Sequence, residues 1–133
     1  MSGYILVIPY LINTMQRILV VDDDKDILEV IKYILEDSGY EVDTLSDGHF
    51  LFDKIDEHFP DLILLDVMLG NMDGRELCKD VKTTEATHNI PVILISATHA
   101  ISSFTSAGSP NDFISKPFDI NELLDSVQKQ LAA

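Results

Sequence analysis

Acidic, hydroxyl and basic side chains stand at the ends of four short apolar runs in this sequence. Three consecutive aspartates, residues 22–24, follow the first run, and Asp66 follows a later one. Ser96 and Lys116 hold the corresponding places near the ends of two further runs. If the runs are parallel strands, their carboxyl ends meet at one edge of a sheet, where ligands bind in open α/β folds. The spacing therefore predicts one site that contains all of these side chains.

Carboxylates held close together repel one another, so each resists losing its proton unless a cation offsets the charge. Mg²⁺ suits such a site, because it prefers oxygen ligands and keeps places in its shell for water and phosphate oxygens. Lys116 would add a second positive charge. Taken alone, the aspartate triplet is more typical of a solvated turn that caps the next helix. Together with Asp66, Ser96 and Lys116, it favours a site for a metal ion and a transferable phosphoryl group.

An α/β scaffold would bring these residues together, and the hydrophobic pattern predicts one. Short apolar runs, typical of strands, alternate with stretches in which apolar residues recur at the 3.6-residue period of a helix. The strand runs are apolar throughout, which indicates burial on both faces of a parallel sheet between helix layers. We predict strands at 18–21, 42–45, 62–65, 92–95 and 113–114, and helices at 25–38, 48–58, 73–81 and 119–131.

Local signals mark several helix ends. Gly39 has the usual place of a residue that ends a helix. Asp73 and Asp119 are each followed three residues later by a glutamate, as at a capped helix start. The stretch 96–108 should hold one more helix, but its serines and threonines compete for backbone hydrogen bonds. We expect that helix to be short or frayed.

Composition narrows the class of protein. The 133 residues fit one domain, and 23 acidic against 9 basic residues give a net charge of −14. This charge argues against direct nucleic-acid binding, which depends on basic residues that neutralise phosphates. Cys78 is the only cysteine, so an internal disulfide is excluded and a cytoplasmic location is favoured. The histidines, residues 49, 58, 88 and 99, lack metal-ligand spacing, so we expect them on the surface, and we expect Cys78 to be a packing residue.

Residues 1–14 differ from the rest, since they carry no charged side chain. This segment is too short to span a bilayer and lacks the basic start of a signal peptide. At Met15 the sequence changes character and looks like the natural beginning of a domain. We therefore divide the chain into an apolar extension, 1–14, and a domain, 15–133. The extension is either the product of an upstream start codon or an additional strand or dimer arm. We expect a single-domain protein, because the chain ends just after the last predicted helix.

Four segments of the chain, ILVVDDD, PDLILLDVMLGNMDG, PVILISA and DFISKPF, resemble the successive signatures of response-regulator receiver domains of two-component signalling, the CheY-like family. The resemblance runs from about Met15 to Leu131. It implies a flavodoxin-like (βα)5 doubly wound fold with a five-stranded parallel sheet in the order 2-1-3-4-5. It also implies that the domain is not a turnover enzyme, since it would catalyse only its own phosphorylation and dephosphorylation.

By this resemblance, Asp66 is the phospho-acceptor and takes its phosphoryl group from a phosphohistidine. The donor would be a histidine kinase or a phosphotransfer protein. The cofactor would be Mg²⁺, with Asp23 as a direct ligand and Asp22 as a partner that acts directly or through water. Asp66 and the backbone carbonyl of Met68 would complete the protein ligands.

The resemblance assigns the remaining roles to three residues. Ser96 matches the hydroxyl that hydrogen-bonds the phosphoryl group, and Lys116 matches the lysine that pairs with it. Phe113 matches the aromatic switch whose rotamer follows activation. The family also has a cis peptide bond before the residue that Pro117 matches. Phosphorylation would then alter the surface around the fourth helix, fifth strand and fifth helix for partner binding, and a phosphorylation-dependent dimer is an open alternative.

Gly70 departs from the family pattern, because proline usually stands at this position. We expect a looser loop there but no lost ligand. Two rival functions use the same strand ends: a haloacid-dehalogenase-like phosphatase acting through the D-x-D of residues 22–24, and a flavodoxin-like cofactor binder. The phosphatase leaves Asp66 unexplained, and the cofactor binder needs a glycine- and hydroxyl-rich loop where the aspartates stand. An inactive pseudo-receiver is disfavoured because every phosphorylation residue has a match.

Overall fold

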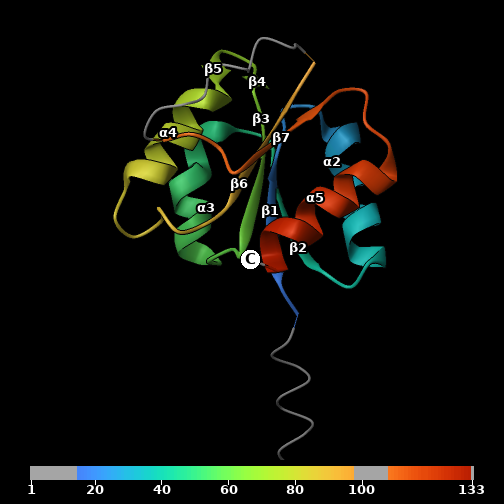
Figure 1. Ribbon diagram of the computed structural model, residues 1–133. Coiled ribbons are helices and arrows are strands. Elements are labelled where there is room, and N and C mark those ends of the chain that lie inside the picture. Colours follow the sequence, from blue (N-terminus) through green and yellow to red (C-terminus); the bar gives the residue numbers. More distant parts are fainter. Residues whose placement is uncertain (1–14, 98–107, 133) are drawn as a thin grey trace, which may run out of the picture.

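A parallel sheet runs through the centre of the computed structural model, which describes residues 15–97 and 108–132 (Figure 1). Within these residues the sheet has five strands in the order β2-β1-β3-β6-β7. The strands are β1 (Arg17–Val21), β2 (Glu41–Leu45), β3 (Leu62–Asp66), β6 (Val92–Ser96) and β7 (Asp112–Ser115). Counted along the chain, this is the predicted order 2-1-3-4-5, so the predicted fold is confirmed.

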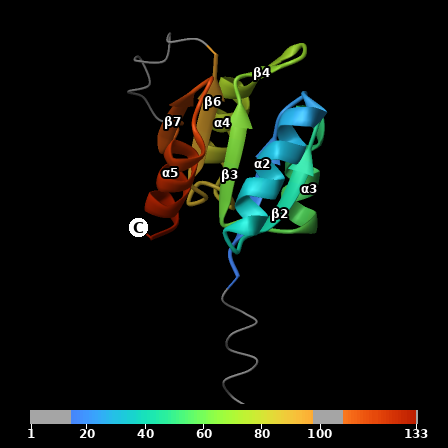
Figure 2. The same ribbon diagram turned by 90° about the vertical axis from the view of Figure 1, so that its right-hand side faces the viewer.

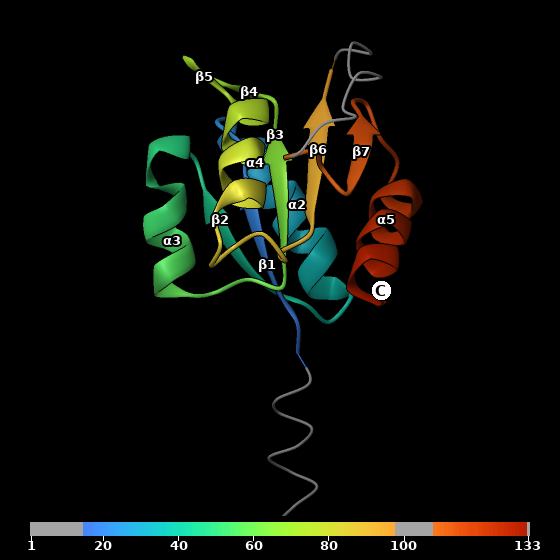
Figure 3. The same ribbon diagram turned by 60° about the vertical axis from the view of Figure 1, so that its left-hand side comes forward.

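Helices cover both faces of the sheet. They are α2 (Lys25–Asp37), α3 (Leu51–Glu57), α4 (Gly74–Thr83) and α5 (Ile120–Ala132), with a 3-10 turn, η1 (Gly48–Phe50), before α3. Helices α3 and α4 lie on one face and α2 and α5 on the other (Figures 1 and 3). Each face has its own apolar core, and successive residues of β1 alternate between them, with Leu19 in one and Ile18 in the other. A strand buried on both faces must be apolar throughout, which accounts for the continuous runs in the sequence.

The predicted helix ends are largely confirmed. The side chain of Asp73 accepts a hydrogen bond from the N–H of Arg75, and Asp119 accepts one from the N–H of Glu122. Gly39 follows the end of α2 with a φ of +97°, a conformation that glycine adopts at little cost.

Burial in the core raises the pKa of the Cys78 thiol to about 11, as befits a packing residue.

Two elements differ from prediction. The predicted helix 48–58 is divided into η1 and α3. A two-stranded hairpin, β4 (Met68–Leu69) with β5 (Met72–Asp73), projects beyond the carboxyl ends of the strands and was not predicted (Figure 2). Most of the predicted helix at 96–108 and all of the extension 1–14 fall outside the described residues. No helix within the described ranges has the length and apolar character needed to cross a membrane.

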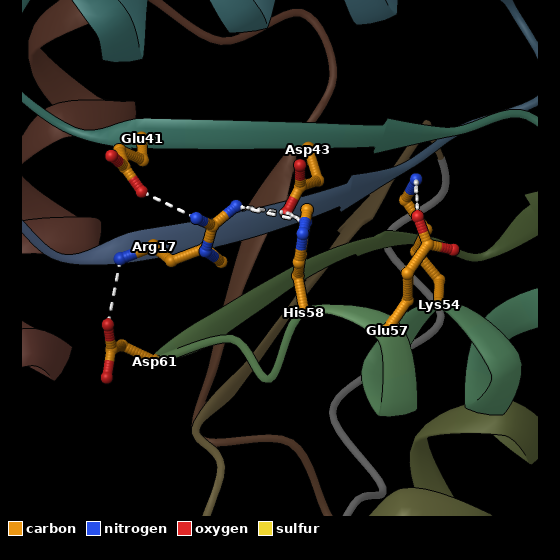
Figure 4. A network of polar contacts seen from close by, with 7 residues as sticks. All are labelled: Arg17, Glu41, Asp43, Lys54, Glu57, His58 and Asp61. Atoms are coloured by element: carbon orange, nitrogen blue, oxygen red, sulfur yellow. Dashed lines mark hydrogen bonds and ion pairs between the residues drawn. The ribbon is translucent and has the colours of Figure 1, made fainter.

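A polar cluster lies at the opposite end of the sheet, where the strands begin (Figure 4). The guanidinium of Arg17 donates to Glu41 at 2.6 Å and to Asp43 at 2.8 Å. The backbone N–H of Arg17 donates to Asp61 at 2.8 Å, and the ring of His58 lies 3.4 Å from the guanidinium. This amino-edge cluster ties β1, β2 and the segment before β3 together. As predicted, His58 is exposed, as are the histidines at 49 and 88, whereas the fourth, at 99, is outside the described residues.

Candidate functional site

The carboxyl ends of β1 and β3 bring Asp22 and Asp66 together. Val21 pairs with Leu65 in the parallel register of these strands, so the two aspartates that follow lie side by side. Oxygen atoms of Asp22, Asp23 and Asp66 lie within 4.8 Å of one another. The sheet register thus assembles three carboxylates from two separate segments, as the sequence predicted.

The three consecutive aspartates do different things. Asp22 is 1% exposed, and its Oδ1 accepts a hydrogen bond from the N–H of Asp24 at 2.9 Å. Asp23 is the exposed member of the carboxylate cluster. Asp24 caps α2, accepting from the N–H of Asp26 at 3.0 Å and of Ile27 at 3.4 Å. The cap predicted as the alternative reading is therefore present, but only at Asp24.

Lys116 bridges the two buried carboxylates. Its Nζ lies 3.1 Å from Oδ2 of Asp22 and 3.1 Å from Oδ2 of Asp66. The backbone N–H of Lys116, the residue after β7, donates to the carbonyl of Ser96, the last residue of β6, at 2.7 Å. The Lys116–Pro117 peptide bond is cis, as predicted. The sheet thus fixes the main chain of Lys116 beside the site, and the two carboxylates hold its ammonium group.

Burial governs the electrostatics of this cluster. It raises the pKa of Asp22 above the ordinary carboxyl value, against the lowering effect of hydrogen bonds from the N–H of Asp24 and from Lys116. Burial alone would lower the pKa of Lys116, but hydrogen bonds to Asp22 and Asp66 outweigh it, so that pKa is raised. Lys116 therefore stays charged and offsets only part of the negative charge around it.

The two remaining residues predicted near the phosphoryl group lie on β6 and β7. Ser96 ends β6 and is fully buried at the same edge of the sheet as Asp66. Phe113 lies one strand further, pairs with Leu94 in register and is half-buried against the core beneath α3 and α4. Both positions suit the predicted roles, which stay predictions.

The hairpin β4–β5 supplies a further part of the site. The N–H of Met68 donates to Oδ1 of Asp66 at 3.2 Å, and Met68 is 63% exposed. Gly70 makes the turn with a φ of +63°, and a Cβ added there would lie 3.9 Å from Oδ2 of Asp23. The two-residue Gly-Asn turn at 70–71 is a hairpin signal from which this element could have been predicted.

The donor set fits a hard divalent cation. Asp22, Asp23 and Asp66 offer carboxylate oxygens within a small volume, and among the residues that the structure describes only Lys116 forms an ion pair with them. Mg²⁺ prefers such oxygen ligands. The D-x-D phosphatase needs Asp24 as a free acid, but Asp24 is committed to the cap of α2. The arrangement of aspartates therefore favours the metal and phosphoryl site over the phosphatase.

Comparison with known proteins agrees with this geometry. The family model described as "response regulator receiver domain" matches residues 18–128. The response regulator MprA of Mycolicibacterium vanbaalenii is 34% identical over 110 residues, which cover 81% of this chain and 47% of that protein. The chain thus spans about half the length of the curated relatives it matches.

Solved structures show the same fold. A CheY-like response regulator receiver domain protein from Methanospirillum hungatei superimposes with a TM-score of 0.81 at 30% identity, covering 90% of this chain and 95% of the other. TrrA of Thermotoga maritima, solved in complex with Mg²⁺ and beryllofluoride, has a TM-score of 0.78 at 31% identity, over 87% of this chain and 99% of TrrA.

Proposed function

Because the chain belongs to the response regulator receiver domain family, we propose that it is a phospho-acceptor of two-component signalling in which Asp66 takes the phosphoryl group. The observation that carries this proposal is the position of Lys116, whose Nζ lies 3.1 Å from the carboxylates of both Asp22 and Asp66. An ammonium group beside the acceptor oxygen can pair with the phosphoryl oxygens once the group is transferred.

The proposed cofactor is Mg²⁺, held by Asp22, Asp23, Asp66 and the backbone carbonyl of Met68. The acidic cluster supports this assignment, as does the complex of the related TrrA with Mg²⁺. When bound, the ion would offset negative charge on the phosphoryl oxygens. Asp22 and Asp23 follow β1, whereas Asp66 ends β3 and Met68 begins β4, so two separate segments of the chain would supply the ligands.

The transfer requires one covalent step from the protein, the attack of Asp66 on phosphorus. A carboxylate oxygen of Asp66 forms a bond to phosphorus as the bond to the donor histidine nitrogen breaks, and that nitrogen keeps the electron pair. Positioning and charge neutralisation supply most of the catalysis. The hydrogen bond from Met68 N–H to Oδ1 of Asp66 orients the acceptor carboxylate. Lys116 then neutralises charge on the transferred group.

The negative charge of the transferred phosphoryl group would trigger the proposed switch. Ser96 would move to hydrogen-bond the acyl phosphate, and Phe113 would turn inward into the space that Ser96 leaves. The surface around β7, α5 and the segment between β6 and β7 would then shift population toward a state that binds a partner. The phosphodonor would be a histidine kinase or a phosphotransfer protein, and hydrolysis of the acyl phosphate would reset the domain. We propose a cytoplasmic location, because the single cysteine suits a reducing compartment, and a domain that spans residues 15–133.

Intact-mass measurement after incubation with acetyl phosphate tests the proposal. We expect one added phosphoryl group when Mg²⁺ is present and none when EDTA replaces it. Borohydride reduction of the acyl phosphate, followed by peptide mapping, should place the modification at residue 66. Labelling that does not need a divalent ion, or a modification mapped to another residue, would contradict the proposal.

A further inference from the structure

Gly74, the first residue of α4, lies against the main chain of the proposed acceptor. A Cβ added at Gly74 would lie 2.0 Å from the carbonyl oxygen of Asp66, 2.9 Å from its carbonyl carbon and 3.0 Å from the Cα of Val67. These are backbone atoms, which cannot swing aside as the end of a side chain can. Glycine is thus the residue that lets α4 begin in contact with Asp66.

The same contact closes the loop that follows Asp66. The N–H of Gly74 donates to the carbonyl of Val67 at 2.7 Å, and the N–H of Val67 donates to the carbonyl of Ile95 at 2.9 Å. The chain just past Asp66 is therefore held by β6 on one side and by the start of α4 on the other. Between these two anchors the hairpin runs out and back, with Met68 opposite Asp73 in its register.

We propose that Gly74 is a positioning residue for the acceptor site. Its missing side chain allows α4 to fix the main chain of Asp66 and Val67, and through them the carboxylate of Asp66 and the carbonyl of Met68. The inference rests on the proposed function, in which those two groups bind the metal. A methyl group at residue 74 must displace either α4 or residues 66–68. Either movement breaks the hydrogen bond from the N–H of Gly74 to the carbonyl of Val67.

Gly74→Ala is the direct test, and Gly48→Ala is its matched control. A Cβ at Gly48 would also be crowded, lying 2.7 Å from Cδ1 of Leu77, 3.2 Å from Cδ1 of Leu69 and 3.2 Å from Sδ of Met72. These atoms are the ends of flexible side chains on α4 and the hairpin. Both substitutions therefore insert a methyl into the same region, but only one presses on the main chain of Asp66.

We expect Gly74→Ala to weaken Mg²⁺ binding and slow labelling by acetyl phosphate by about tenfold or more, as for other changes behind a ligand. Gly48→Ala should lose stability in urea unfolding yet bind Mg²⁺ as wild type does. Magnesium titrations followed by amide signals of residues 22–24 and 66–68 give the affinities without relying on activity. Equal Mg²⁺ affinities in the two folded variants would overturn the proposal.

Hydrogen exchange of the wild-type Gly74 amide provides a second test if Gly74→Ala does not fold. We expect this amide to exchange more slowly when Mg²⁺ and beryllofluoride are bound, because the ligands hold the loop whose base it closes. An unchanged exchange rate would overturn the proposal. Wild-type protein that neither binds Mg²⁺ nor takes up phosphate would count instead against the proposed function, so the two failures are distinguishable.

Discussion

The two ends of the sheet each hold one basic anchor among carboxylates, but they differ in exposure to water. At the carboxyl edge, Lys116 contacts the side chains of Asp22 and Asp66, which are 2% and 7% exposed. At the amino edge, Arg17 contacts those of Glu41 and Asp43, which are 44% and 18% exposed. Similar sets of charged residues therefore stand in very different surroundings.

The surroundings change what each cluster can do. At the carboxyl edge, burial is the main cause of the raised pKa of Asp22, so the cluster favours any added positive charge. At the amino edge, the hydrogen bond from Arg17 to Asp43 is the main cause of the raised pKa of Arg17. Water screens the remaining charge there, and the forked guanidinium joins β1 to β2. Burial, more than the number of charges, marks the candidate site.

Aspartates at the two ends of β3 give the sharpest test of this contrast. Asp66→Asn should abolish labelling by acetyl phosphate, a fall of at least about a hundredfold, because an amide is a poor nucleophile. Asp61→Asn should label as wild type does, since the Asp61 side chain accepts the N–H of Arg17 at the far end of β3 and an asparagine oxygen can replace it. Intact-mass time courses give both rates. Wild-type labelling of Asp66→Asn, or loss of labelling in Asp61→Asn, would break the contrast.

Lys116→Ala should have the next largest effect. It removes the charge that faces the proposed phosphoryl oxygens, so we expect labelling to slow by about tenfold while the fold is kept. Beryllofluoride should then fail to shift the NMR signals of Phe113 and Ser96. Without the ammonium, Asp22 and Asp66 repel each other more, so folding should depend more on Mg²⁺. The same shifts in treated variant and treated wild type would show that another residue couples phosphorylation to the switch.

The positions of the carboxyl-edge residues could be predicted, because each lies at the end of a strand and continuous apolar runs indicate the strands. The amino-edge cluster could not, because Arg17 meets Glu41 across 24 residues and Asp61 across 44, and only the register brings them together. The proposed role of Gly74 could not be predicted from the sequence either, since its contact with Asp66 depends on where α4 begins. Sequence patterns place residues on elements, whereas contacts between elements need the tertiary structure.

Arg17→Ala should affect stability and not chemistry. The guanidinium is partly exposed, so we expect a loss of only about 1 kcal/mol in the free energy of unfolding. Urea unfolding measures the loss, which should shrink in high salt because exposed ion pairs are screened. Arg17→Lys keeps the positive charge but loses the forked guanidinium. Its free energy of unfolding should lie between those of wild type and Arg17→Ala. Slower labelling in Arg17→Ala would mean that the two edges are coupled.

The smallest effect concerns the titration of two carboxyl groups with opposite surroundings. Burial raises the pKa of Asp22, whereas the side-chain hydrogen bond from the exposed Arg75 lowers the pKa of Asp73. In metal-free protein, the contribution of Asp22 to stability should therefore fall as the pH rises from its unfolded pKa through its raised folded pKa. The contribution of Asp73 is present above its unfolded pKa and is lost as the pH falls through its lowered folded pKa.

Carbon-13 NMR of the side-chain carboxyl groups, recorded in EDTA across the acid range, should show Asp22 titrating at higher pH than Asp73. Added Mg²⁺ should lower the midpoint of Asp22, because a nearby cation favours the charged carboxylate. The midpoint of Asp73 should not change, since its hydrogen-bond partner is Arg75 rather than the metal site. Midpoints that move equally with Mg²⁺ would show a general ionic effect, and burial would then no longer explain why only one edge of the sheet carries the candidate site.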